Sequence, residues 1–118
     1  MSRFVILTHD WPSLHWDFLV ECCGVLRAWR LLAEPAAEAD IPAEPNADHR
    51  LLYLDYEGPV SGDRGSVSRW DAGTCDWLAD EPERAELELR GAKLTGRATL
   101  RADRGGWVFR LTANPAAD

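Results

Sequence analysis

Hydrophobic and polar residues alternate along much of this chain, and the alternation predicts β-strands rather than helices. Residues 84–90 alternate most regularly, because Ala85, Leu87 and Leu89 are each flanked by charged side chains. Short runs of strand-forming residues, separated by turn residues, are predicted as strands at residues 3–8, 15–22, 25–32, 66–71, 74–79, 84–90, 94–101 and 107–112. Short strands with such even spacing are typical of a barrel or a sandwich, so the predicted fold class is all-β.

One segment between the predicted strands lacks this alternation. Residues 34–48 are rich in alanine, glutamate and proline, and the three prolines are spaced so that no long helix can form. We therefore predict one long Pro-rich loop here, with room for a short helical turn at residues 36–39. The next stretch, residues 51–56, fits either a strand or a tight helical turn that carries Tyr53 and Tyr56.

The length of the chain and its cysteines set the broad class of protein. A chain of 118 residues can bury one hydrophobic core, so residues 1–118 are predicted to form a single domain. No apolar run approaches the roughly 18 residues of a membrane-spanning helix, and the first apolar run is too short for a secretory signal. An odd number of cysteines, Cys22, Cys23 and Cys75, indicates reduced thiols. These features predict a cytoplasmic protein with no membrane partner.

Two of the three histidines lie near the N-terminus, His9 and His15, with Asp17 two residues beyond. Because side chains alternate along a strand, His15 and Asp17 share one face, while the opposite face is apolar and belongs to the core. His9 can fold back beside them across a short turn. Two imidazoles and one carboxylate suit a divalent ion such as Mn²⁺, Zn²⁺ or Fe²⁺ and leave coordination positions open for catalysis. The alternative is a set of surface polar residues beside a buried strand.

The third histidine, His49, precedes a segment that also carries Arg50 and Tyr53. Because no histidine is used elsewhere, we expect all three to converge on one site; the alternative is that His49 is a solvated loop residue. Trp11 lies in the turn between the first two histidines, where a partly exposed indole can stack on a nucleic-acid base. Its alternative role is filling the core.

Several motifs extend these clusters along the chain. They are residues 3–10, Leu14-His15-Trp16-Asp17-Phe18 with Glu21, residues 24–29, Asp48-His49, residues 55–58, Trp70-Asp71-x-Gly73-Thr74 and Leu89-x-Gly91-x-Lys93-Leu94-x-Gly96. In order and spacing, these motifs resemble the 3′-phosphoesterase module of bacterial DNA ligase D. The resemblance spans nearly the whole chain.

The resemblance implies a fold, an activity and a set of site residues. The implied fold is a small, mostly antiparallel β-barrel of about eight strands. The implied activity is Mn²⁺-dependent removal of a 3′-terminal ribonucleoside, and then of a 3′-phosphate, from a nucleic-acid end in DNA repair. By the same resemblance His9, His15 and Asp17 fall on metal ligands, with Mn²⁺ favoured over Zn²⁺ or Fe²⁺. His49 and Tyr53 fall on residues that contact the scissile phosphate.

The sequence departs from the family pattern at cationic positions. Leu19 stands where the family has an arginine that reaches the same phosphate, and residues 33–35 lack the family's basic residue. Arg50, Arg27 or Arg30 could take over as the phosphate clamp, and Arg50 is favoured because it follows the third histidine. If none does, the chain is a catalytically silent metal-binding module that recognises a phosphate end or a repair partner protein. A further alternative is a structural barrel whose histidines serve only the fold.

The net charge of the chain is −7 and it contains a single lysine, Lys93. Binding to the nucleic-acid backbone depends on lysine and arginine, so we expect weak, salt-sensitive binding to long duplexes. A site that holds one terminal phosphate through a bound cation remains compatible with this charge, because local charge can oppose the global sign. A DNA ligase or polymerase is an expected partner that delivers the 3′ end.

Overall fold

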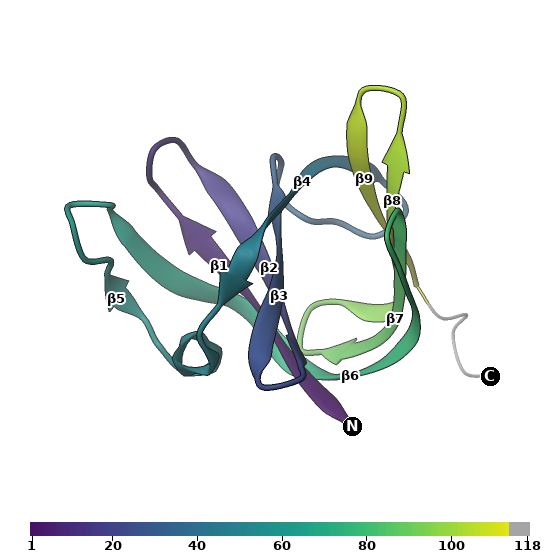
Figure 1. Cartoon of the computed structure of the whole chain (residues 1–118), viewed down its shortest axis with the longest axis horizontal. Helices are drawn as coiled ribbons and strands as arrows, with labels where there is room; N and C mark the ends of the chain where they lie inside the picture. The colour runs from purple at the N-terminus through teal and green to yellow at the C-terminus, as the bar shows by residue number, and fades with distance from the viewer. Residues whose placement is uncertain (114–118) are drawn as a thin grey trace.

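The computed structural model describes residues 1–113 and shows a closed β-barrel (Figure 1). Its elements are β1 (Ser2–His9), β2 (His15–Cys22), β3 (Val25–Leu31), β4 (Asp40–His49), η1 (Leu51–Leu54, a 3₁₀ helix), β5 (Gly58–Pro59), β6 (Ser66–Glu81), β7 (Arg84–Gly91), β8 (Thr95–Asp103) and β9 (Gly106–Ala113). Strands pair antiparallel in the order β1-β2-β3-β4-β9-β8-β7-β6, and β1 also pairs with β6. This pairing closes a barrel of eight strands, with β5 added on β6, so the predicted small antiparallel barrel is confirmed.

The inside of the barrel is filled by the alternate residues that the strand pattern predicts. Phe18 of β2 lies near its centre, and its ring meets that of Phe109 edge-on at 5.5 Å and that of Phe4 at 6.0 Å. Each of these rings is at most 1% exposed. Every one of the eight barrel strands contributes to this inner core, which accounts for the stability of the closed sheet through burial of apolar surface.

A second apolar cluster, the outer core, covers the other face of β1, β2 and β3. Its buried members are Val5, Leu7, Leu19, Leu26, Ala28, Leu54 and Val67. Leu54 comes from η1 and Val67 from β6, so the 3₁₀ helix and the start of β6 close over this part of the barrel (Figure 1). Both faces of β2 are therefore buried, and His15 and Asp17 do not lie on an open polar face as the surface alternative required.

The prediction of a long loop at residues 34–48 is wrong for its second half, because β4 begins at Asp40. Within β4, Ile41 and Ala43 are buried while the proline and glutamate positions between and after them are exposed. Pro42 still contributes to the sheet, because its carbonyl accepts the N–H of Leu32 at 2.9 Å. Pro45 lies beyond the pairing with β9, where β4 has an open edge that tolerates proline. The prolines exclude a helix, but they do not exclude a strand.

The helical turn allowed at residues 36–39 does not form. Ala37 instead makes an isolated parallel bridge to Leu111, and Glu38 adopts a φ of 60°. For residues 51–56 the sequence fitted either a strand or a tight helical turn, and the structure shows the helical turn, the 3₁₀ helix η1. No helix within residues 1–113 has the length and apolar character needed to cross a membrane.

The two strands predicted at residues 66–71 and 74–79 are one strand, β6, of 16 residues. Its register shifts once against β1 and once against β7, so the alternation is interrupted and the sequence resembles two short strands. Gly73 lies where β6 passes between these neighbours, and a Cβ there would fall 2.0 Å from the carbonyl oxygen of Arg90. Glycine is required because the backbones approach so closely.

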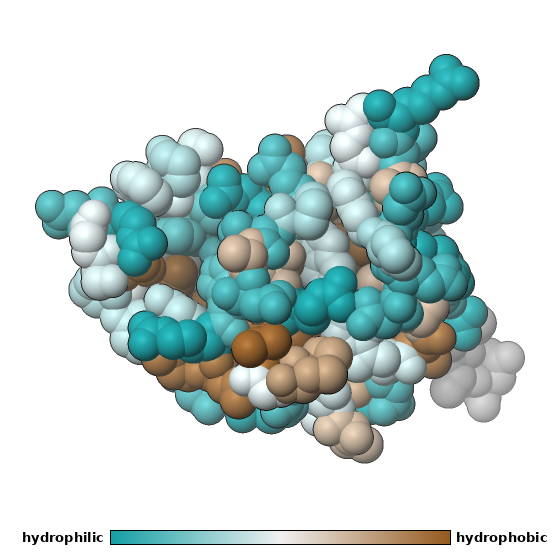
Figure 2. All heavy atoms as spheres, in the orientation of Figure 1, coloured by the Kyte–Doolittle hydropathy of each residue, from teal (hydrophilic) through white to brown (hydrophobic). Residues whose placement is uncertain are grey.

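The surface of the barrel is mainly hydrophilic on the face shown in Figure 2. Hydrophobic atoms gather near η1, whose Leu51 and Leu52 are 38% and 45% exposed. The same helix carries Tyr53 and Leu54 on its inner side, toward the outer core. η1 is thus a short element held by two side chains, and it forms one boundary of the site described next.

Candidate metal centre

The candidate site lies where β1 ends and β2 begins. His9 is the last residue of β1, His15 is the first of β2, and the two are directly opposed in the antiparallel register. Their ring centroids lie 4.7 Å apart. Asp17 follows two residues along β2, so alternation directs its side chain to the same face as that of His15. Strand pairing alone therefore assembles the three side chains that the sequence singled out.

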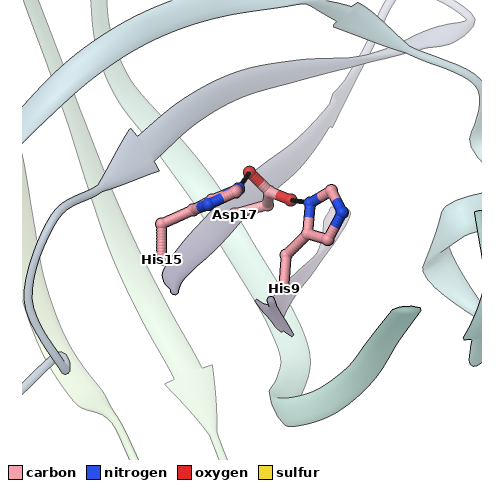
Figure 3. A group of neighbouring side chains, drawn as sticks. All are labelled: His9, His15 and Asp17. Atoms are coloured by element: carbon pink, nitrogen blue, oxygen red, sulfur yellow. Dashed lines mark hydrogen bonds and ion pairs between the residues drawn. The ribbon is translucent and has the colours of Figure 1, made fainter. Parts of the chain in front are cut away.

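The Asp17 carboxylate lies between the two imidazoles (Figure 3). One carboxylate oxygen lies 3.1 Å from Nδ1 of His9, and the other lies 3.1 Å from Nε2 of His15. One ligand atom from each of the three residues can be chosen so that all lie within 4.8 Å of one another. His15 and Asp17 are buried, at 2% and 5% exposure, while His9 is partly accessible.

Backbone carbonyls determine which imidazole nitrogens are available. Nδ1 of His15 lies 2.8 Å from the carbonyl oxygen of Ser13, and Nε2 of His9 lies 2.8 Å from that of Arg64. Since a carbonyl only accepts, these nitrogens donate, and the remaining nitrogen of each ring points at Asp17 with its lone pair unless the ring carries a second proton. Nε2 of His15 is buried, and the Asp17 carboxylate at 3.1 Å is its neighbour in the site.

These lone pairs and the carboxylate form a donor set that fits a divalent metal ion. The set offers two nitrogen ligands and one oxygen ligand. Carbonyl contacts orient the two imidazole rings, as is usual around protein-bound metals. A bound cation would contact Nε2 of His15 and the Asp17 carboxylate beside it.

Protonation at the site is governed by opposing effects. Burial raises the pKa of Asp17, but the hydrogen bond and positive charge of His15, with contributions from His9 and His49, outweigh it and leave the pKa below its usual value. Burial lowers the pKa of His15, but Asp17 and the Ser13 carbonyl outweigh it and leave that pKa raised. The carboxylate is therefore ionised near neutral pH and available to a cation.

A pocket of about 440 Å³ opens beside these residues. His9 and Asp17 line its wall, whereas His15 is not part of the lining and lies buried behind them. Its other polar or aromatic lining residues are Trp11, Arg30, Asn46, Asp48, His49, Arg50, Tyr53 and Arg64. The structure thus brings all three predicted phosphate-contacting residues to the same pocket as two of the predicted ligands.

His49 is held at the end of β4 in the same manner as the other histidines. Its Nδ1 lies 2.8 Å from the carbonyl oxygen of Ala47, so Nδ1 donates and Nε2 is left for another partner. The ring of Tyr53, in η1, meets that of His49 edge-on at 5.8 Å. Arg50 lies between them in sequence and is exposed at the pocket edge.

Sequence reasoning missed the contribution of the turn at residues 61–65. Arg64 orients His9 through its backbone carbonyl, and a backbone contact leaves no mark on the side-chain pattern. Gly65 is the available indicator, because it has a φ of 71° and a Cβ there would fall 2.2 Å from Oδ1 of Asp10. The same Asp10 oxygen accepts the N–H of Ser66 at 2.8 Å, which ties the His9 turn to β6.

Leu19 does not face the pocket. It is fully buried in the outer core and is not among the residues that line the cavity. An apolar side chain at this position packs against the covering helix η1 and the start of β6, so the position serves burial in this protein.

Comparison with known proteins supports the family resemblance that the motifs suggested. The family model described as the DNA ligase D 3′-phosphoesterase domain matches residues 7–102, a range that contains all six predicted site residues. The multifunctional non-homologous end joining DNA repair protein LigD of Mycobacterium tuberculosis (strain H37Rv) is 34% identical over 96% of this chain. Multifunctional non-homologous end joining protein LigD of Pseudomonas aeruginosa is 32% identical over 92% of it.

The chain matches 16% of the length of the first relative and 15% of the second. The likeness therefore concerns a small part of each of these proteins. The range that the family model matches contains the two histidines and the aspartate at the junction of β1 and β2, together with the histidine that ends β4. This protein belongs to the DNA ligase D 3′-phosphoesterase domain family.

Proposed function

We propose that this protein is a metal-dependent phosphoesterase that removes a 3′-ribonucleoside or a 3′-phosphate from nucleic-acid ends. Membership of the DNA ligase D family supports a role in DNA end repair by non-homologous end joining. The observation that carries the proposal is the convergence of lone pairs from His9, His15 and Asp17 beside the pocket that His49 and Tyr53 line. Mn²⁺ is the proposed ion, with Zn²⁺ and Fe²⁺ as alternatives.

The charges around the pocket favour a phosphate group despite the acidic chain. Three arginines line the pocket, Arg30, Arg50 and Arg64, against two carboxylates, Asp17 and Asp48. A divalent cation would add two further positive charges. The charge around the pocket is therefore positive, opposite to the net charge of −7. A terminal phosphate would be attracted to the pocket, while the remaining surface would repel nucleic acid.

Each side chain has a role that its geometry allows. A bound divalent ion supplies Lewis-acid stabilisation of a phosphate oxygen. His49, oriented by the Ala47 carbonyl, uses Nε2 to hold a proton for the leaving oxygen or to donate to the phosphate. The Tyr53 hydroxyl donates a hydrogen bond to a phosphate oxygen. Buried positions of His15 and Asp17 keep the ligand set fixed and limit access of water behind it.

The test is turnover of a primer-template that ends in a 3′-ribonucleotide or a 3′-phosphate, with and without Mn²⁺. We expect metal-dependent removal by the wild type. His9→Ala should lose both turnover and Mn²⁺ binding measured by calorimetry, whereas His49→Ala should lose turnover and keep the metal. Removal that persists without metal, or in both variants, would contradict the proposal.

A second candidate function is a catalytically silent module that binds a metal and recognises a phosphate end or a repair partner protein. The observation that favours it is Leu19, buried in the outer core at the position where the family pattern has an arginine. Mn²⁺ binding that requires His9, without any removal of the 3′ group, is the result expected of this module.

A partner that delivers the DNA end is part of the proposal. With a net charge of −7 and one lysine, the chain has little general attraction for a duplex. A DNA ligase or polymerase that holds the duplex would supply this attraction. We also propose the cytoplasm as the compartment, because Cys22, Cys23 and Cys75 are all free thiols.

A further inference from the structure

Arg30 occupies a position in β3 that the sequence alone does not distinguish from other arginines. In the β2–β3 register its Cα is the direct partner of that of Asp17. Directly opposed residues of antiparallel strands project to the same face of the sheet, about 5 Å apart. Ala28 and Leu26, two and four residues earlier on this face, belong to the outer core. Arg30 is therefore the next side chain on that face, where the apolar cover ends and the pocket begins.

The side chain of Arg30 also lacks the ion pairs that several other arginines of the chain form. Arg3, Arg27 and Arg90 each form an ion pair with an aspartate, at 2.7, 2.7 and 2.9 Å. Among the residues that the structure describes, no ion pair or hydrogen bond involves the Arg30 side chain, and its Nε is buried without a partner. The carboxylate opposite it, that of Asp17, lies between the two histidines instead.

The other two arginines of the pocket are less suited to hold an anion. Arg64 donates from Nε to the carbonyl oxygen of Ser61 at 2.7 Å and from Nη2 to the Ser61 hydroxyl at 3.2 Å, so its guanidinium is bound within its own turn. Arg50 is exposed at the edge, where solvent screens its charge. The positive charge of Arg30 acts on His15, so it reaches the centre of the site.

We propose that Arg30 binds the terminal phosphate of the substrate and donates from its guanidinium to phosphate oxygens. It would thereby replace the arginine that the family pattern has at the position of Leu19. The proposal rests on the proposed function and names the cation of that site. A buried N–H that lacks a partner in the protein gains one when an oxyanion enters. A guanidinium presents a planar fork of donors that fits two oxygens of a phosphate at once, which an ammonium group does not.

The experiment compares Arg30→Gln and Arg30→Lys with one matched control, Arg101→Gln, and with Arg50→Gln, which removes the arginine that the sequence favoured as the phosphate clamp. Arg50→Gln changes the exposed arginine at the edge of the same pocket, and Arg101→Gln changes an exposed arginine of β8. For each variant we would measure kcat and KM on a 3′-phosphate end, Mn²⁺ affinity by calorimetry, and the unfolding midpoint. The last two show whether the metal site and the fold are intact.

We expect Arg30→Gln to lower kcat/KM by about tenfold to 100-fold, the loss usual for a charged hydrogen bond, with Mn²⁺ affinity unchanged. Arg30→Lys should recover only part of this loss, and Arg101→Gln should show none. Wild-type kcat/KM in Arg30→Gln would overturn the proposal, as would a larger loss in Arg50→Gln. A loss that is explained entirely by weaker Mn²⁺ binding would also overturn it.

Failure of the proposed function would be seen separately. If the wild type removes no 3′ group, binding of inorganic phosphate to the Mn²⁺-loaded protein becomes the deciding measurement. Phosphate binding that is lost in Arg30→Gln and kept in Arg101→Gln retains Arg30 as the anion-binding residue of a silent module. Equal phosphate binding by the wild type and Arg30→Gln, or no binding by either, overturns the proposal.

Discussion

At the scale of single residues, the site depends on backbone carbonyls that fix three imidazoles. His9, His15 and His49 each donate one N–H to a carbonyl, at 2.8 Å in every case. This leaves one nitrogen per ring free to face the Asp17 carboxylate or the pocket. Orientation is thus set before any ligand arrives, and less entropy is lost when one binds.

Trp11 provides a test of how the nucleic-acid end is held. Its indole lines the pocket and is 43% exposed, so it can stack on the terminal base. We expect Trp11→Ala to weaken binding of a 3′-phosphate oligonucleotide by about 1–3 kcal/mol, similarly for all four bases, while binding of inorganic phosphate is unchanged. Trp11→Phe should retain most of the affinity.

Leu14 is the matched control for Trp11. It lies in the same connection between β1 and β2 and is 57% exposed, but it does not line the pocket. Fluorescence titration of Leu14→Ala should give the wild-type affinity. An equal loss of affinity in both variants would mean that the connection as a whole, rather than stacking by the indole, determines binding.

Cys75 predicts how stability changes in alkaline solution. Burial raises the pKa of this thiol from 9.0 to about 11 in the folded protein. The folded state therefore holds the proton more tightly than the unfolded chain, and this contribution is complete below pH 9.0 and is lost as the pH rises through about 11. Urea midpoints measured across this range should fall in the wild type and fall less in Cys75→Ala.

The cysteines can also be distinguished by alkylation at mildly alkaline pH. Cys23 is exposed, whereas Cys75 is fully buried and stays protonated. Mass spectrometry after treatment with iodoacetamide should find the label at Cys23 and none at Cys75 until the protein is unfolded. Early labelling of Cys75 would show that the barrel opens locally at β6.

At the scale of elements, the turn between β7 and β8 is organised by one carboxylate of β6. Asp71 is 3% exposed, and its oxygens accept the backbone N–H groups of Ala92, Lys93 and Leu94 at 2.9 to 3.0 Å. Gly91 is required beside it, since a Cβ there would fall 2.4 Å from the carboxylate. The contact of Asp71 with this turn thus explains why the motif around Asp71 and the motif around Gly91 occur together.

We expect Asp71→Ala to reduce the free energy of unfolding by roughly 3 kcal/mol, because three backbone N–H groups lose a buried carboxylate as their acceptor. Urea denaturation measures this change. In Asp103→Ala the loss should be below about 1 kcal/mol, since Asp103 is exposed and accepts only from Arg104 within its own turn. Equal losses would indicate that a general effect of charge, rather than the turn, is responsible.

The turn at residues 61–65 links a second element to the metal centre. Gly62 and Gly65 have similar positive φ angles, 77° and 71°, so alanine strains the backbone at both. Only at Gly65 would the new Cβ also meet Asp10 and Trp11, at 2.2 and 2.7 Å. We expect Gly65→Ala to displace the carbonyl that orients His9 and to lower Mn²⁺ affinity by about tenfold or more.

Gly62→Ala is the control for this prediction. Its Cβ would have only the flexible side chain of Arg64 nearby, at 3.6 Å, so the strain is not accompanied by a collision. Calorimetry should find wild-type Mn²⁺ affinity in Gly62→Ala. An equal loss of affinity in both variants would attribute the effect to strain in the turn. The carbonyl contact to His9 would then not explain the loss.

At the scale of the whole molecule, the distribution of charge bears on which part of a nucleic acid the proposed phosphoesterase would recognise. The chain has a net charge of −7, while its pocket gathers three arginines beside the metal centre. We therefore expect attraction to be confined to a terminal phosphate. A protein that covers a long duplex instead releases many counterions and loses affinity steeply with salt.

The expected salt dependence follows from this distribution. With one or two phosphates neutralised, the slope of log affinity against log salt should be only about −1 to −2. Fluorescence anisotropy with short and long duplexes that carry the same 3′-phosphate end should give the same affinity for both. A steeper slope, or an affinity that grows with duplex length, would mean that a wider surface contacts the backbone.

Much of this protein was determined by local sequence. Strand segments such as residues 84–90 follow from alternation, because the direction of successive side chains in a strand is fixed by the covalent geometry. The same geometry placed His15 and Asp17 on one face. The positions of His9 and His49 in polar clusters, together with the family resemblance, then predicted them as further site residues.

Tertiary structure alone decided the remainder, because pairing and burial depend on residues far apart in the chain. β4 forms a strand because it pairs with β3 and β9, and its prolines made the sequence resemble a loop. The carbonyl that orients His9 comes from Arg64, 55 residues away. Arg30 became distinct from other arginines only when the β2–β3 register placed it opposite Asp17 and packing left its buried Nε without a partner.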